Sequence, residues 1–150
     1  MVEDTVRAVY RLGCDPGPVQ NYCMTTANTA GSGAIMGYQG SLSHAANSFT
    51  LVSAGAPPGE FGIFYYGGST DLVPTGEGVR CVGPPFFRLP VVLVDASGVA
   101  AWPLDLTTAP LPGGMISPGT SWYFQFWYRD PPGGPAHFNF SDGLELRFCP

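Results

Sequence analysis

Lysine is absent from this chain of 150 residues, whose six cationic residues are all arginine. Without a lysine amine, the chain can form neither a Schiff base nor the phosphate-binding loop of P-loop enzymes. The arginines are scattered and the formal net charge is −5, so no basic surface is available to neutralise the phosphates of a nucleic acid. We therefore expect no nucleic-acid partner.

Charged residues and long apolar runs are both scarce. Charged side chains are 11% of the residues, compared with roughly 25% in an average soluble domain. No run approaches the roughly 18 apolar residues that mark a transmembrane helix, so we expect no membrane span. The first residues are acidic and unlike a signal peptide, so a secreted origin would imply a mature or excised piece with an added Met.

Signatures of catalysis are missing as well. The chain has only two histidines, His44 and His137, both in expected loops, and no GxSxG sequence marks a nucleophilic serine. Glu60, Glu77 and Glu145 can be nominated for the paired carboxylates of glycoside hydrolysis, but no spacing singles out a pair. We therefore assign no catalytic residues, and a hydrolase is the least favoured class.

Glycine and proline, by contrast, are abundant. The 21 Gly and 16 Pro follow no period, and 45% of the residues are hydrophobic, which argues against both collagen and disorder. Short runs between Gly/Pro-rich turns predict an all-β fold, an antiparallel β-sandwich or jelly roll of about eight to ten short strands. A single domain is expected over residues 21–150, preceded by an N-terminal strand (5–12) and linker within residues 1–20. The other expected strands cover residues 34–42, 48–54, 61–66, 78–82, 86–89, 91–94, 99–106, 123–129 and 143–149.

The four cysteines, Cys14, Cys23, Cys81 and Cys149, lie far apart and form no CxxC pair, so a zinc site is not expected. An even number in a Gly/Pro-rich β chain indicates two disulfides and an oxidising compartment. Three pairings exist, and we favour Cys23–Cys81 with Cys14–Cys149, the second tying the start of the domain to its last strand. The alternative is four free, buried thiols in a cytosolic protein.

The most distinctive stretch is Ser121–Asp130, in which six of ten residues are aromatic. Side chains of a strand alternate between its two faces, which divides the stretch into two sets. One set is wholly apolar or aromatic and is predicted to be core: Trp122, Phe124, Phe126 and Tyr128. The other set combines rings with an amide and a guanidinium, which is typical of a contact surface: Tyr123, Gln125, Trp127 and Arg129.

This second set suggests a platform for sugar. Trp127 and Tyr123 would lie about 13 Å apart along the strand, with Gln125 and Arg129 as hydrogen-bond donors and Trp102 and Tyr66 as weaker neighbours. Sugar rings stack their C–H faces on aromatic planes, and the low charge suits a neutral polymer. The alternative is that a second layer, or the loop over residues 110–119, covers this face and makes it core.

An ordered series of motifs runs from residue 21 to residue 148: Asn21–Cys23, Phe49–Ser53, Cys81–Gly83, Phe87–Pro90, Val94–Gly98, Leu104–Thr107, Ser117–Thr120, Trp122–Asp130 and Asn139–Glu145. This series resembles a β-rich domain common at the C-termini of large secreted proteins of planctomycetes and myxobacteria. The resemblance implies that Cys23 pairs with Cys81, that the chain is secreted or at the cell surface, and that its role is accessory, binding or anchoring. It implies no activity.

The leading hypothesis is therefore a secreted, non-catalytic module that binds an extracellular polymer, with polysaccharide as the expected chemical class, and that needs no cofactor. The alternative is a structural, self-assembling subunit of a filament, coat or surface layer, in which the N-terminal strand pairs with the sheet edge of a neighbouring copy. Three aspartates in Gly-containing turns, Asp95, Asp130 and Asp142, are weak candidates for calcium, although aspartate is also a standard turn residue.

Overall fold

The computed structural model describes residues 19–150, and this part of the chain is all-β, as predicted. Its strands pair in antiparallel fashion, and the helical content is one short 3-10 turn, η1 (Pro131–Gly133). The strands are β1 (Gln20–Tyr22), β2 (Ile35–Gly40), β3 (Phe49–Ala54), β4 (Phe61–Gly67), β5 (Thr70–Thr75), β6 (Gly78–Val82), β7 (Phe87–Leu93), β8 (Val99–Leu104), β9 (Ser121–Arg129) and β10 (Phe138–Arg147).

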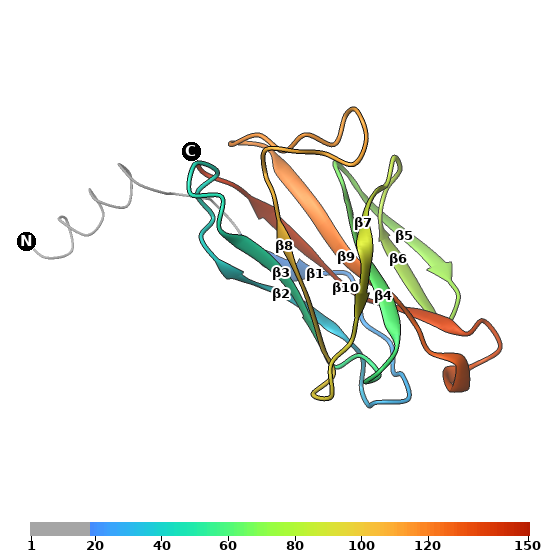
Figure 1. The fold of residues 1–150 in the computed structure, drawn as a ribbon. Coiled ribbons are helices and arrows are strands. Elements are labelled where there is room, and N and C mark those ends of the chain that lie inside the picture. Colours follow the sequence, from blue (N-terminus) through green and yellow to red (C-terminus); the bar gives the residue numbers. More distant parts are fainter. Residues whose placement is uncertain (1–18) are drawn as a thin grey trace, which may run out of the picture.

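The strands form a sandwich with an additional hairpin on one side (Figure 1). A five-stranded sheet, in the order β1-β10-β9-β4-β7, packs against a three-stranded sheet, in the order β2-β3-β8. The β5–β6 hairpin lies on the opposite side of the five-stranded sheet, mainly over β10. The large sheet therefore has an inner face toward β2-β3-β8 and an outer face that is partly covered by the hairpin.

The main core fills the space between the two sheets. The four side chains of β9 predicted to be core are all buried there, which confirms the division of the aromatic strand by alternation: Trp122, Phe124, Phe126 and Tyr128. The inward positions expected near the C-terminus are buried as well: Leu144, Leu146 and Phe148. Each such side chain stabilises the fold by about 1.5–3 kcal/mol relative to an exposed one, so aromatic and aliphatic burial dominates this core.

Most differences from the predicted strands have local causes. The strands expected on either side of Pro90 are one strand, β7, because β7 is at the edge of its sheet, where a residue without an N–H is tolerated. Strand β10 begins at Phe138, five residues before the expected position, because a register shift between Phe140 and Gly143 interrupts its alternation.

Two strands were not predicted at all. Strand β5 contains Pro74, is half-exposed and pairs only with β6, so its sequence has little of the apolar alternation of a core strand. Strand β1 has three residues and includes Gln20, while Val19 packs against the core, so the folded unit extends back across the expected boundary at residue 21. The expected strand over residues 5–12 lies outside the described residues.

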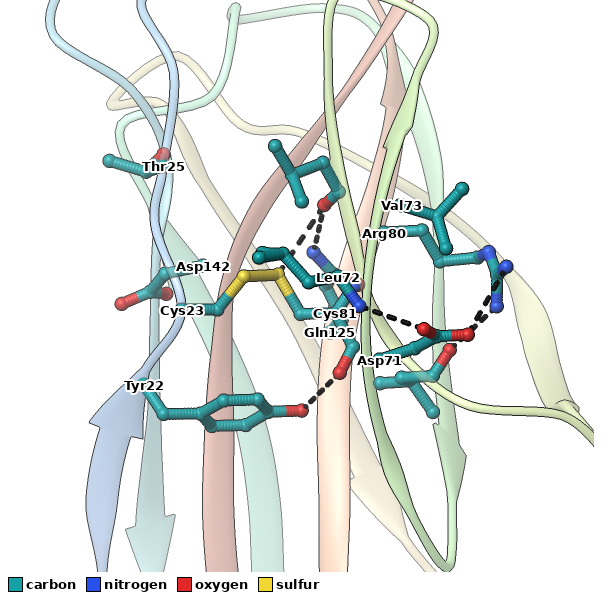
Figure 2. The surroundings of a disulfide bond; sticks show 12 residues. Tyr22, Cys23, Thr25, Asp71, Leu72, Val73, Arg80, Cys81, Gln125 and Asp142 are labelled. Carbon is teal, nitrogen blue, oxygen red and sulfur yellow. Dashed lines mark hydrogen bonds and ion pairs between the residues drawn. A yellow bond between two sulfur atoms is a disulfide. The ribbon is translucent and has the colours of Figure 1, made fainter.

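A disulfide joins Cys23 and Cys81, as predicted, and fastens the hairpin to the segment that follows β1 (Figure 2). Beside it, the Tyr22 hydroxyl donates a hydrogen bond of 2.8 Å to the Cys81 carbonyl. Cys149 is also disulfide-bonded, and its expected partner, Cys14, lies outside the described residues. Within residues 19–150, no helix has the length and apolar character required to cross a membrane.

Replacing both Cys23 and Cys81 by serine should lower the free energy of unfolding by about 2–4 kcal/mol. The disulfide links residues 58 apart in the sequence, and without it the unfolded chain gains conformational entropy. Urea denaturation gives this difference directly. Hydrogen exchange should rise more in the β5–β6 hairpin than in β2-β3-β8, because the disulfide attaches the hairpin and joins no residue of the three-stranded sheet. Equal acceleration in both sheets would contradict this local role.

Candidate functional site

The predicted contact surface lies on the outer face of the five-stranded sheet. The alternation of β9 directs Tyr123, Gln125, Trp127 and Arg129 to this face, opposite the buried core set. The structure does not expose them equally, because the β5–β6 hairpin forms a second layer over part of the face. Coverage by a second layer was one of the two alternatives that the sequence left open, and it applies to part of the surface.

Gln125 is fully buried beneath the hairpin, so its expected role as a ligand donor is wrong. Its Oε1 accepts hydrogen bonds from the Cys81 backbone N–H at 2.9 Å and from the Tyr65 hydroxyl. Its Nε2 donates to the carbonyls of Val79 at 2.8 Å and Ser141 at 2.7 Å. The amide thus joins β9 to β6, β4 and β10, and no donor is left for a ligand.

Tyr66 is also wrong as a binding candidate. Its ring is fully buried in the main core, because its position on β4 faces the inner side of the sheet beside Trp122 and Phe124. The hydroxyl donates a 2.7 Å hydrogen bond to the Gly114 carbonyl, and burial raises its pKa to about 12. A ligand at the surface has no access to this ring.

Tyr123 and Trp127 do not form one platform. Tyr123 is half-buried and packs edge-on against Tyr22, with ring centroids 5.7 Å apart. Trp127 is likewise half-buried, but it packs on Phe138, also at 5.7 Å. The covered Gln125 lies between the two rings along β9, so they do not form one continuous exposed surface, although both pack against the same small outer cluster.

A hollow of about 410 Å³ opens beside Trp127, where the part of the outer face covered by the hairpin meets the uncovered β4–β7 part. We call it the outer hollow. Its walls come from β4, the hairpin, the start of β7, β9 and β10, and they are mostly aromatic or apolar. The lining residues are Ile63, Tyr65, Thr75, Arg80, Phe86, Arg88, Trp127, Phe138 and Phe140.

The rings of the outer hollow support one another. Phe138 packs against both Trp127 and Phe140, and Tyr65 packs edge-on against both Phe140 and Phe86. At the tip of the hairpin, Gly76 has φ +60°, and a Cβ there would lie 2.4 Å from the Phe138 ring. Glycine at this position therefore allows the hairpin to close over that ring.

Two guanidinium groups line the outer hollow. Arg80 lies over the Phe86 ring, 4.8 Å from its centroid, and donates a 2.9 Å hydrogen bond to the Val82 carbonyl. It also forms a 3.5 Å ion pair with Asp71, a residue outside the lining of the hollow (Figure 2). Arg88 is exposed and lies opposite Tyr65 in the pairing of β7 with β4.

The remaining candidates lie elsewhere. Arg129 is exposed at the end of β9 and does not line the outer hollow. Trp102 is half-buried on β8 of the other sheet, where it lines a second hollow of about 480 Å³ along the side of the sandwich at which β7 and β8 are the edge strands. Arg88 lines both hollows, so it lies between the two candidate tryptophans.

The calcium candidates serve as structural hydrogen-bond acceptors at separate places. Asp95 accepts from backbone N–H groups of its own turn, and buried Asp130 accepts from Thr29. Asp142 accepts from the Met36 N–H at 2.8 Å, and its burial raises its pKa above the usual range. Among residues 19–150, no group of three His, Cys, Asp or Glu side chains is arranged to hold a metal ion.

Four of the five residues considered for catalysis have side-chain contacts within the fold, and the fifth, Glu60, precedes β4 outside the hollow. Glu77 accepts a hydrogen bond from the Ala136 N–H, and Glu145 accepts one from the Gln20 side chain. His44 contacts the Ile116 carbonyl at 3.0 Å, and the His137 ring contacts the carbonyl at Pro131. These contacts belong to different parts of the fold, and none of the nominated residues lines the outer hollow.

Comparison of the chain with protein-family models, with curated proteins and with solved structures gives no match. The functional argument therefore depends on the outer hollow itself.

Of the residues that line the outer hollow, only Trp127 was identified from the sequence. Alternation about Asn139 could have indicated Phe138 and Phe140, whereas no local pattern distinguishes Arg80 or Arg88.

Replacing Gln125 by leucine should lower the free energy of unfolding by at least about 2 kcal/mol, because the buried Ser141 carbonyl, the part-buried Val79 carbonyl and the buried Cys81 N–H lose this partner. Replacing Tyr65 by phenylalanine removes one hydroxyl from the same junction and should cost less. Chemical denaturation of both variants provides the measurement. Stability equal to that of the unmodified chain in the leucine variant would show that this junction does not hold the hairpin.

Proposed function

We propose that this protein is a secreted, non-catalytic module that binds an extracellular polysaccharide at the outer hollow. The observation that carries the proposal is the position of Trp127, a half-exposed indole in a hollow walled by other aromatic rings. Buried faces of these rings fix the geometry, while the remaining aromatic surface is available to a ligand.

The chemistry of the outer hollow suits a sugar. Pyranose rings present C–H faces that pack on aromatic planes, and their hydroxyls bond to guanidinium groups at the rim. A volume of about 410 Å³ lies within the usual range of ligand sites, roughly 300–1,000 Å³. The hollow continues into the uncovered β4–β7 face, which leaves room for a polymer to extend beyond it.

An extracellular location is supported by the Cys23–Cys81 disulfide, since such bonds persist in oxidising compartments. The low charge of the chain also favours contact with polymers of sugar over contact with nucleic acid. The proposal assigns the binding role to Trp127 with its neighbours in the outer hollow, while Tyr123 and Trp102 are excluded from that site by their positions.

Replacing Trp127 by alanine should reduce binding to insoluble glycans at least tenfold, because the packing of a sugar C–H face on the indole ring is lost with the side chain. A pull-down or affinity electrophoresis on a panel of neutral and acidic polysaccharides gives the measurement. Trp102→Ala is the matched control, since this tryptophan is also half-buried but lines the other hollow.

Thermal unfolding separates a binding effect from a folding effect in this experiment. Trp127→Ala should retain the fold, and Trp127→Phe keeps a ring against Phe138 in case the alanine variant is unstable. The phenylalanine variant should bind more weakly than the unmodified chain but more strongly than the alanine variant. Equal binding by all three folded proteins, or no binding by the unmodified chain to any glycan, would reject the proposal.

Self-assembly is the second candidate, and a separate observation favours it. Phe61, Val91 and Leu93 are each more than half exposed, and they lie together on the outer face where β4 pairs with the edge strand β7. Apolar groups beside a free strand edge are typical of an association surface. The N-terminal strand expected to take part lies outside the described residues.

Sedimentation velocity over a hundredfold concentration range tests this second candidate. A self-assembling subunit should form larger species as concentration rises, and Leu93→Lys should shift the population back to monomer by placing a charge in the apolar contact. Ser117→Lys is a control, since it adds the same charge in an exposed loop before β9, at the opposite end of the sheet from Phe61 and Leu93. A monomer at every concentration would reject self-assembly.

A further inference from the structure

We infer that the outer hollow selects sugars bearing a carboxylate, that is, uronic acid residues of an acidic polysaccharide, and that Arg88 binds the carboxylate. The inference rests on the proposed function and names its ligand class. It depends on the charges of the hollow, whereas the proposed function depends on its rings, so the two can fail separately.

The outer hollow is cationic although the chain is acidic. Two of the six arginines line it, and none of its lining residues is acidic, while the whole chain has a net charge of −5. Both guanidiniums are close enough to Tyr65 to act electrostatically on its hydroxyl, where they oppose the effect of burial on its pKa. Both arginines therefore line the hollow beside Tyr65, with Arg88 opposite it in the strand pairing.

The two arginines differ in how far their own contacts occupy them. Arg80 is held by the Val82 carbonyl, the Phe86 ring and Asp71, which fix its position and offset part of its charge. Arg88 is exposed, and among residues 19–150 no acidic side chain forms an ion pair with it. Arg88 is therefore the group with donors available to a ligand, and Arg80 supplies a fixed positive charge beside it.

A carboxylate is the anion that fits this combination best. The planar guanidinium binds a carboxylate through two parallel hydrogen bonds, and a uronic acid carries that group on the same ring whose C–H face can pack on Trp127. A free inorganic anion would use Arg88 without the aromatic walls, and a neutral sugar would use the walls without Arg88. Only an acidic sugar uses both features of the hollow.

The net charge of the chain also bears on selectivity. At long range an acidic protein repels a polyanion, so binding must come from short-range contacts inside the hollow. A single uronic acid residue at Arg88, followed by residues over the apolar part of the β4–β7 face, satisfies this condition. Phe61, Val91 and Leu93 form that apolar part, which offers the polymer contacts without charge.

The test pairs each acidic oligosaccharide with its own ester. Oligomers of galacturonate, of mannuronate and guluronate, and of glucuronate are compared by isothermal titration calorimetry with the same oligomers after full esterification of their carboxyl groups. Esterification keeps the ring and its linkage but removes the negative charge. For at least one pair we expect the acid to bind about tenfold or more tightly than the ester, the effect of one charge-assisted bidentate contact.

Matched arginine variants locate the effect. Arg88→Gln should reduce the preference for acid over ester to less than about twofold, and Arg88→Lys should retain part of it, because charge remains while the bidentate geometry is lost. Arg129→Gln is the control, since Arg129 is equally an exposed arginine of the outer face but does not line the hollow. Arg80 is left unchanged because its contacts also hold the hairpin.

The outcomes are separable. Equal affinity for acid and ester, binding of neutral glycans alone, equally tight binding of sulfated neutral glycans, or an unchanged preference in Arg88→Gln would each overturn the inference. If the unmodified chain binds neutral glycans and Trp127→Ala does not, the proposed function stands without the inferred preference for acidic sugars. If no polysaccharide of either kind binds to the unmodified chain, both are overturned.

Discussion

The buried amide of Gln125 is the interaction on which the arrangement of the outer face depends. Its four hydrogen bonds connect β9 to three other elements, including the hairpin strand β6 at two positions, Val79 and Cys81. An amide has two donors and an acceptor with two lone pairs, so this set of partners satisfies it completely. The hairpin consequently has one position on the sheet, which the nearby disulfide reinforces.

The position of the hairpin creates the outer hollow. Because the hairpin lies over β10 and the middle of β9, it covers Gln125 and leaves the β4–β7 part of the face open. Trp127 lies at the boundary, with one side against Phe138 and the other toward the hollow. The same rings therefore stabilise the small outer core and form the surface to which we assign binding, so a ligand would meet side chains that are already held in place.

The alternation of β9 was readable from the sequence because successive side chains of a strand must point to opposite faces. The apolar set of that strand is core, the fold is all-β, and Cys23 pairs with Cys81, all as expected. The two wrong assignments have different causes. Alternation along β9 shows which face Gln125 occupies, but it does not show whether another layer covers that face. For Tyr66, the sequence of β4 has rings on both faces and does not show which face is buried.

Local sequence thus determined the type of fold and the inward face of the aromatic strand, because these depend on periodicity and composition within short segments. The pairing of Cys23 with Cys81 was favoured among three possibilities and implied by the series of motifs along the chain. Tertiary structure alone decided which outward residues remain accessible. Arg80, Arg88 and Phe138 come from three different elements and meet Trp127 only after the sheets pair and the hairpin folds back. Their proximity depends on long-range strand pairing and on the hydrogen bonds of one buried amide, and neither is expressed in the spacing of residues along the chain.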